Sequence, residues 1–372
     1  MKAIDGESIG RRIAEARARR GLTQADLASA TSLDRSAIAK IENGLRRISA
    51  LELARIASVV GERIEWFVME TPPAIVSHRN VAEPGAESST IDRSVERVAW
   101  NVEFVAEHDE RLGMRSPAVL AKPCNSADAE RSAVEARRIL RLNSVEPLFD
   151  ISGRAAEIGL LIFSLDLGVE AADAALIHLR NGGVAVVNGH LHVGRRRLAA
   201  AHELGHYLFA EEYAVDWRVS DRDDDDAWES RLDRFARAVL LPTRGLRESW
   251  DGLRSGGDDL RTTCVKLASR FRVDMSTLAR RLVELGMISQ TDAQAVRAMR
   301  TTRADIVEFN LVVNDELAAP CLPRAYEAAV VRLYRQEVIS AARATDLLFE
   351  LWDDQDLPDL PTLPESAVWN LV

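Results

Sequence analysis

The sequence predicts a mainly helical protein with a small mixed β-sheet, an α+β fold spread over more than one domain. Three observations predict it. Residues 9–68 hold short stretches with helical apolar spacing, separated by turn residues, which predicts an all-α N-terminal domain. Residues 158–190 hold three short apolar runs, which predict strands. The segments that follow return to apolar residues three and four apart, which predicts a helical remainder.

Composition limits the class of protein. The 372 residues are 47% hydrophobic and 28% charged, enough for two or three domains with their own cores. There is no run of eighteen apolar residues and no apolar leader near the N-terminus, so we expect a cytoplasmic protein with no membrane partner. Cys124, Cys264 and Cys321 form no CxxC pair, which argues against disulfides and a cysteine zinc site.

The charge is distributed unevenly along the chain. The net charge is −10, but residues 1–70 hold 12 Lys plus Arg against 10 Asp plus Glu. Any contact with nucleic acid is therefore expected in the N-terminal domain.

The N-terminal segment has the pattern of a DNA-binding helix pair. A helix from Ile9 ends at Gly21, and Thr23 is placed to cap a second helix. A tight connection leads into a third helix from Arg35 to Glu42, which Asn43-Gly44 stops. Two short helices joined by such a turn are the helix-turn-helix arrangement for the DNA major groove.

The sequence of this segment resembles the Xre (Cro/C1) helix-turn-helix domain over about sixty residues. We place this domain at residues 1–70. The resemblance rests on Leu22-Thr23-Gln24, on Asp26-Leu27-Ala28 and on Ile38 with Ile41-Glu42-Asn43-Gly44. It implies a homodimer on a double-stranded DNA operator. The implied phosphate contacts are Gln24 and either Lys40 or Arg46, and the implied base contacts are Asp34, Arg35 and Ser36. For each residue singly, a solvated helix face explains the polarity nearly as well.

Residues 71–90 are rich in proline and small polar residues, which predicts a linker. Helices are expected at 91–111, 127–142 and 151–157. The apolar runs at 158–167, 175–180 and 184–188 predict strands, with a hairpin turn at Asn181-Gly182-Gly183. A sheet beside a metal-binding helix could hold an extended peptide as an added strand.

The stretch RLAAAHELGHYLFA, from Arg197 to Ala210, carries metal-binding spacing. His202 and His206 are four apart, so on a helix their imidazoles project from one face within reach of one ion. Glu203 lies beside them, where a general base belongs. The surrounding residues are small and apolar, so the polar trio would be buried, and a metal would offset that cost.

A third ligand is expected in a second helix. Glu229 and Asp233 are four apart, so Glu229 could ligate while Asp233 accepts the outer N–H of a ligand histidine. HExxH followed by ExxxD is the glutamate-zincin arrangement. The acidic run from Asp223 to Asp226 lacks the spacing of an EF-hand and is expected to be a solvated loop.

Together, RRLAAAHELGHYLFA and ESRLDRFARAVLLP resemble the ImmA/IrrE family of metallopeptidases, which is often joined to an Xre-like domain. The resemblance implies a zincin-like domain, placed at 91–256, with Zn²⁺ on His202, His206 and Glu229 and with Glu203 as general base. Leu232-Asp233 stands where the family has Ala-Asn, a change that Asp233 tolerates as a hydrogen-bond partner. Zinc would lower the pKa of its water towards about 7, and Glu203 would pass the proton to the leaving amine.

The group that stabilises the oxyanion is left open. The four residues close enough in sequence to be candidates are His190, His192, Arg195 and Tyr213.

Two C-terminal parts complete the chain. Residues 257–290 predict a helical pair that resembles a second helix-turn-helix, although covering the protease core is the preferred interpretation. Four arginines of this segment are candidates for contact with DNA or a partner: Arg270, Arg272, Arg280 and Arg281. Residues 291–372 are expected to form a small helical unit and a proline-rich tail.

Our leading functional hypothesis is a DNA-binding transcriptional regulator whose zinc endopeptidase domain cleaves a repressor or an antitoxin, the substrates that the family resemblance implies. The alternative is a non-proteolytic Xre-type repressor or antitoxin of a toxin-antitoxin module. In that case the metallopeptidase fold would serve metal-dependent structure or binding of the cognate toxin. The ligand set does not distinguish these two.

Overall fold

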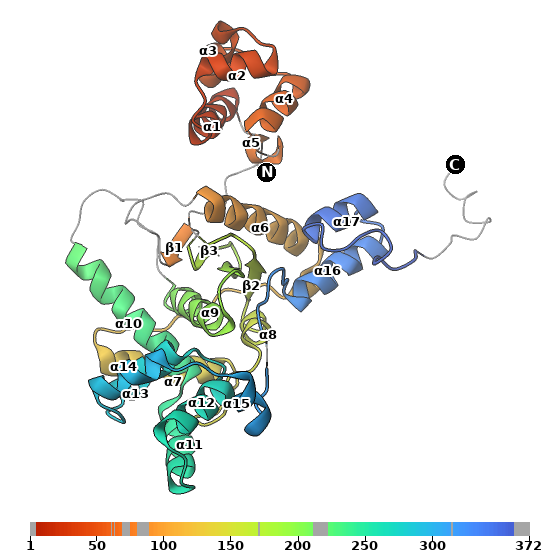
Figure 1. Ribbon diagram of the computed structural model, residues 1–372. Coiled ribbons are helices and arrows are strands. Elements are labelled where there is room, and N and C mark those ends of the chain that lie inside the picture. The colour runs from red at the N-terminus through yellow and green to blue at the C-terminus, as the bar shows by residue number, and fades with distance from the viewer. Residues whose placement is uncertain are drawn as a thin grey trace. The chain divides into compact units, whose positions relative to one another are not determined.

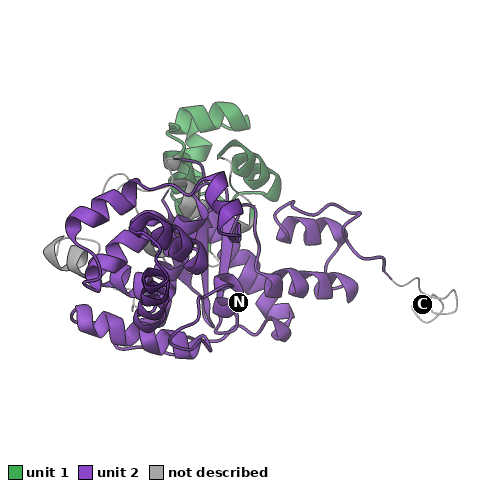
Figure 2. Cartoon of the chain, turned by 60° about the horizontal axis from the view of Figure 1, so that its bottom comes forward, with its two compact units in different colours: residues 1–72 green, residues 73–372 purple. Residues whose placement is uncertain are grey.

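The computed structural model describes residues 5–60, 62, 64–68, 75–79, 89–169, 172–210, 222–313 and 315–360. The chain divides into two compact units, Met1–Pro72 and Pro73–Val372 (Figure 2). No helix in these described ranges is both long and apolar enough to cross a membrane.

The N-terminal unit is entirely helical where it is described, as predicted. Its helices are α1 (Gly6–Arg19), α2 (Gln24–Thr31), α3 (Arg35–Glu42), α4 (Ala50–Val60) and α5 (Ile64–Val68). Thr23 and Asp26 form the capping box that starts α2, and Ser32 takes a left-handed conformation that ends it. Buried side chains from all five helices, among them Ile13, Leu27 and Ile38, form its core.

The second unit is built on a mixed sheet (Figure 1). Its strands are β1 (Ile75–Arg79), β2 (Leu160–Leu165), β3 (Ala174–His178) and β4 (Gly183–Asn188), in the order β1-β3-β4-β2. β2 runs parallel to β4, while β3 is antiparallel to both β4 and β1. The predicted α+β class with a small mixed sheet is confirmed.

Strand β1 corrects the linker prediction for residues 71–90. Residues 75–79 pair with the outer edge of β3, because backbone hydrogen bonds can hold an edge strand whose sequence lacks a strong apolar rhythm. At the opposite edge, Ser164 and Cys321 exchange backbone hydrogen bonds of 2.8 Å. A peptide that joined the sheet beside β3 would therefore have to displace β1.

Helices cover both faces of the sheet. The helices of this unit are α6 (Ser89–His108), α7 (Ser126–Ile139), α8 (Ile151–Ala156), α9 (Val193–Leu208), α10 (Arg222–Leu240), α11 (Thr243–Ser255), α12 (Leu260–Phe271), α13 (Met275–Glu284), α14 (Gln290–Ala298), α15 (Arg303–Glu308), α16 (Arg324–Arg335) and α17 (Ala341–Leu347), with a 3₁₀ turn, η1, at Glu110–Leu112. Leu160 and Ile162 face the core that includes α9 and α10, and Leu161 and Phe163 face α6, α16 and α17. Alternate side chains of one strand thus enter two different cores.

The helices α16 and α17 belong to this second core instead of forming the separate C-terminal unit expected for 291–372. The Tyr326 ring meets the edge of Phe163 at 5.2 Å between centroids, and both side chains are fully buried. In Figure 1 both helices lie beside α6. Sequence periodicity shows an apolar stripe on a helix but not the surface that the stripe covers.

The helices α12 and α13 pack into the core that also holds α9 and α10, the arrangement preferred from the sequence. A Cβ atom on Gly194 of α9 would collide with the backbone nitrogen of Asp274, so α9 abuts the start of α13. Arg281 is fully buried, and the guanidinium of Arg272 lies 4.5 Å from the centre of the Phe149 ring. One face of this helical pair is therefore occupied by the core, while Ser276 and Arg280 of α13 remain exposed.

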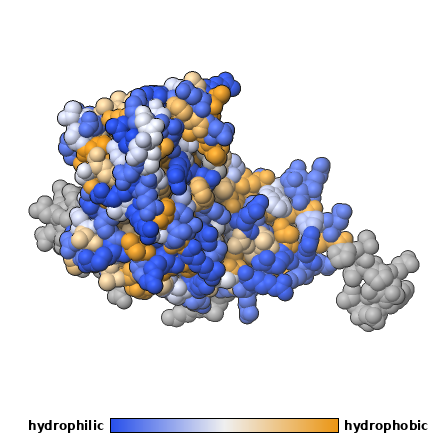
Figure 3. Space-filling view, turned by 90° about the horizontal axis from the view of Figure 1, so that it is seen from below, coloured by the Kyte–Doolittle hydropathy of each residue, from blue (hydrophilic) through white to orange (hydrophobic). Residues whose placement is uncertain are grey.

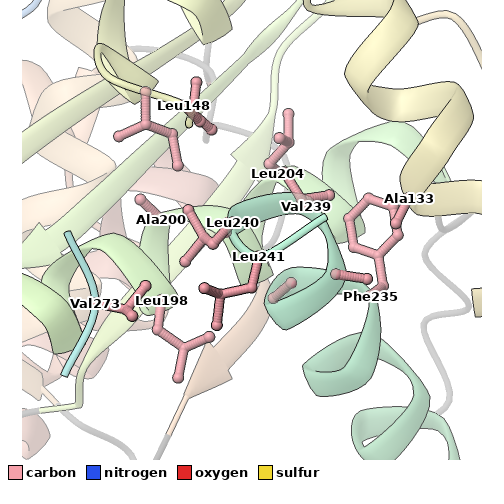
Figure 4. Close-up of a cluster of buried hydrophobic side chains, with 14 of the residues drawn as sticks. Ala133, Leu148, Leu198, Ala200, Leu204, Phe235, Val239, Leu240, Leu241 and Val273 are labelled. Carbon is pink, nitrogen blue, oxygen red and sulfur yellow. The ribbon is translucent and has the colours of Figure 1, made fainter. Parts of the chain in front are cut away.

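The core beneath the sheet is dense and apolar. Figure 4 shows Leu204 of α9 with Phe235 and Val239 of α10 and Ala133 of α7, all buried. On the face in Figure 3, hydrophobic residues form small areas among hydrophilic ones, as on ordinary globular surfaces. The apolar side chains of α9, among them Leu204 and Leu208, lie in the interior.

Candidate metal centre

Helix α9 places the two predicted histidine ligands in the interior. Its four-residue spacing brings His202 and His206 to one face, with ring centroids 5.0 Å apart. Their side chains are only 3% and 2% exposed. Buried imidazoles surrounded by alanine and leucine need a polar partner, because burial without one costs free energy.

Helix α10 supplies the carboxylates, and a glycine permits its approach. A Cβ atom on Gly205 would lie 2.8 Å from Leu232 Cδ2 and 3.0 Å from Phe235 Cδ1. The glycine of HELGH therefore lets the buried side of α10 rest against α9.

The acidic run Asp223 to Asp226 lies inside α10, so the prediction of a loop there was wrong. Acidic residues are favourable in the first turn of a helix, near its positive dipole end.

The three predicted ligands converge. His202 Nε2 lies 3.2 Å from His206 Nε2 and 3.0 Å from Glu229 Oε2, and His206 Nε2 lies 3.6 Å from Glu229 Oε1. One donor atom from each residue lies within 4.8 Å of the others. The Glu229 side chain is 48% exposed, so the group of three candidate ligands is open to solvent on the side of α10.

This donor set fits a tetrahedral zinc ion. Bonds of about 2.0 to 2.1 Å in tetrahedral geometry hold ligand atoms about 3.3 Å apart, close to the three separations found here. Asp233 Oδ1 lies 3.1 Å from His202 Nδ1. When Nδ1 of a neutral His202 donates its hydrogen to Asp233, the lone pair of His202 lies on Nε2, which faces His206 and Glu229. Two imidazole nitrogens facing each other need a cation or a shared proton between them.

Glu203 is the fully buried carboxylate next to His202 on α9. It is not one of the three residues that could share an ion. Its place on α9, one residue after the candidate ligand His202, is where a general base for metal-assisted hydrolysis is expected.

The described oxyanion candidates lie at the start of α9. His192 is the N-cap residue, Arg195 donates to Asp173 Oδ2 at 2.7 Å, and His190 Nδ1 is 3.6 Å from Asp166 Oδ1. Seven residues separate Arg195 from His202, about 10 Å along the helix axis. Tyr213 lies outside the described residues. None of these observations assigns an oxyanion role.

Arg237 is a neighbour of the site that sequence reasoning missed. Its Nη1 lies 3.7 Å from Asp233 Oδ2, and its Nη2 lies 2.7 Å from Glu284 Oε1. Glu229, Asp233 and Arg237 follow one another at intervals of four, and this spacing is the signal that could have found it.

In the N-terminal unit, the structure separates the predicted DNA contacts into two groups. Four of them are exposed, three at the start of α3 and one in its last turn: Asp34, Arg35, Ser36 and Lys40. Gln24 instead donates to Glu42 Oε2 at 2.7 Å, and Arg46 donates to Glu52 Oε1 at 2.7 Å. Glu42 also pairs with Arg17 at 2.6 Å, so it organises the helix pair from inside.

Two family models match the chain. Residues 155–283 match the IrrE N-terminal-like domain of the M78 peptidases, and residues 13–67 match the helix-turn-helix model. The chain joins a helix-turn-helix domain to an IrrE N-terminal-like domain. The predicted resemblance is thereby confirmed for both segments. The IrrE N-terminal-like domain is of a metallopeptidase family, which implies a metal, and the helix-turn-helix domain supports DNA binding.

Solved structures add only weak likenesses. The restriction-modification controller protein C.AhdI from Aeromonas hydrophila is 30% identical over 16% of this chain and 92% of its own, with a TM-score of 0.16. PlcR from Bacillus thuringiensis, solved with the peptide PapR7 and DNA, is 11% identical over 92% of both chains, with a TM-score of 0.19. No curated protein matches the chain.

Proposed function

We propose that this chain is a DNA-binding transcriptional regulator whose second unit is a zinc endopeptidase that cleaves a protein, either a repressor or an antitoxin. The observation that carries the proposal is the convergence of His202, His206 and Glu229 on one point, with Asp233 holding the first imidazole. The match to a metallopeptidase family supports the same chemistry.

Each residue of the site then has a distinct task. His202, His206 and Glu229 hold Zn²⁺, which when bound supplies a Lewis acid that lowers the pKa of water and polarises a carbonyl group. Glu203 takes a proton from the attacking water and returns it to the leaving amine. Asp233 fixes the ring of His202 through its outer nitrogen.

The N-terminal unit directs this chemistry to an operator in double-stranded DNA, which a homodimer would bind through two half-sites. We assign base contacts to Asp34, Arg35 and Ser36, which are exposed together at the start of α3. Lys40 is exposed in the last turn of the same helix and is suited to a phosphate. Gln24 and Arg46 contact phosphates only by giving up carboxylate partners inside the domain.

The test compares zinc-loaded protein with its Glu203→Gln variant, each incubated with the repressor or antitoxin encoded by a neighbouring gene. Mass analysis of the products should show one defined cut with the unaltered protein and none with the variant. Metal analysis should show equal zinc in both, because Glu203 is not a ligand. Cleavage by both proteins, or by neither, would contradict the proposal.

The non-proteolytic alternative has its own signature. His202→Ala should remove zinc, because it deletes a ligand. The alternative is favoured by a variant that loses zinc yet keeps operator binding and toxin neutralisation, while the unaltered protein cuts no peptide bond.

A further inference from the structure

A cavity of about 430 Å³ lies beside the candidate metal centre, between α9, α10, α13 and α14. Asp233, whose Oδ1 is 3.1 Å from His202 Nδ1, is one of its walls. Leu198, one helical turn before His202 on α9, is another. The cavity and the metal centre thus share the Asp233 side chain as a common boundary.

The cavity is lined by three guanidinium groups. Arg237, Arg280 and Arg297 reach it from α10, α13 and α14, and Asp233 is the one carboxylate among its described lining residues. The charge of Arg237 is offset by Glu284 at 2.7 Å. In the part of the chain that the structure describes, neither Arg280 nor Arg297 has a carboxylate within ion-pair distance. Arg280 and Arg297 are exposed residues, so two guanidinium groups without a carboxylate partner line one open pocket.

Hydroxyl groups complete the lining. Ser276 and Thr277 come from the first turn of α13, and the Thr277 hydroxyl donates to Asp274 Oδ2 at 2.8 Å. Guanidinium groups gathered at one pocket attract an anion by their combined positive charge, although solvent screens exposed groups. Because the Thr277 hydroxyl already donates its hydrogen, Ser276 is the hydroxyl donor of the lining, and planar guanidinium groups beside such a donor are groups with which proteins bind carboxylate and phosphate oxygens. The lining therefore selects an anion.

We propose that this cavity binds an acidic side chain, Asp or Glu, of the polypeptide cleaved at the metal centre, an assignment that rests on the proposed peptidase function. Asp233 and Arg237 follow Glu229 by one and two turns of α10, about 6 and 12 Å along its axis. An extended peptide advances about 3.3 Å per residue. The acidic residue of the substrate then lies two to four residues from the bond that is cut.

A binding experiment tests the cavity without reference to catalysis. Full-length zinc-loaded protein is titrated by calorimetry with glutarate, which carries the carboxylate of a glutamate side chain, and with neutral glutaramide, at constant ionic strength. Glutarate should bind and glutaramide should not. The Arg280→Gln/Arg297→Gln double variant should weaken glutarate binding about tenfold or more, the loss of roughly one charge-assisted contact.

A matched control has the same change of charge outside the cavity. Arg270 and Arg300 are exposed and do not line it, so Arg270→Gln/Arg300→Gln should bind glutarate as the unaltered protein does. Thermal unfolding checks that both double variants fold. Unchanged glutarate binding in the cavity variant would overturn the proposal, since the anion would then sit elsewhere, the metal included. Arginine-dependent binding of inorganic phosphate without binding of glutarate would overturn the carboxylate assignment.

A cleavage experiment separates this proposal from the proposed function. Mass spectrometry of a synthetic peptide library should show Asp and Glu enriched two to four residues from each cut, and the cavity variant should keep cutting while losing that enrichment. Cutting without acidic preference refutes the cavity proposal and leaves the peptidase intact. Arginine-dependent glutarate binding with no cutting supports the carboxylate site and refutes the peptidase.

Discussion

Gly205→Ala tests whether close packing of two helices positions the third metal ligand. The added Cβ would lie 2.8 Å from Leu232 Cδ2 and 3.0 Å from Phe235 Cδ1, and both of these side chains are fully buried. Carbon atoms in contact lie about 3.5 to 4.0 Å apart, so these side chains, or α10 with them, must move by roughly 0.5 to 1 Å, and we expect α10 to move because dense packing leaves the buried side chains little room. Ligand positions tolerate shifts of only about 0.2 Å. Glu229 should therefore move out of position.

We expect the affinity for zinc to fall about tenfold to a hundredfold, the range for disturbed support of a metal ligand. The overpacking cost, about 1 to 3 kcal/mol, outweighs the gain of roughly 1 kcal/mol from replacing a helical glycine. The assay is competition for zinc with a chromogenic chelator, alongside thermal unfolding.

Gly252→Ala is the control for this prediction. Gly252 is an exposed residue of α11, and a Cβ there would meet no atom within 4 Å. That variant should be slightly more stable and should bind zinc normally. If Gly205→Ala binds zinc as tightly as the unaltered protein, close packing of α10 against Gly205 does not position Glu229.

Three further results are expected. Asp233→Ala should lower zinc affinity about tenfold to a hundredfold in the same competition assay, because the ring that it holds loses its partner. Burial opposes ionisation of Glu130, but its hydrogen bond from Arg281 holds the pKa of Glu130 below its ordinary value of 4.5. That stabilisation is present above the ordinary pKa and is lost as pH falls through the lowered one. Urea unfolding from pH 7 to pH 3 should therefore show Glu130→Gln about 2 kcal/mol less stable at neutral pH and closer to the unaltered protein in acid. Arg35→Ala should weaken operator binding by about 1 to 3 kcal/mol and relax base preference, whereas Lys40→Ala should reduce the salt slope by about 1, both by fluorescence anisotropy.

Each of these predictions has a contrary outcome. Normal zinc affinity in Asp233→Ala would mean that the hydrogen bond does not orient the ligand. A stability deficit in Glu130→Gln that stays constant with pH would place its cause outside the ionised pair. Equal losses on operator and random DNA for Arg35→Ala would assign that residue to phosphate.

The sequence alone determined the features that depend on local geometry. The spacing of His202 and His206 brings two imidazoles to one helix face wherever the helix is placed, because the helical period is fixed. The turn residues and caps around Thr23 likewise predicted the N-terminal helices. For the same reason, the four-residue interval between Glu229 and Asp233 predicted two carboxylates on one face.

Only the tertiary structure decided which separate elements meet. Glu229 joins the histidines because Gly205 lets α10 approach α9, and the linker residues 75–79 join the sheet because β3 leaves an edge to fill. The arginine-lined cavity takes its charges from three helices whose sequences show no common pattern. Helical period and caps act over a few residues, whereas packing selects among many apolar surfaces of similar character, so the partner of each surface emerges only when the whole core is assembled.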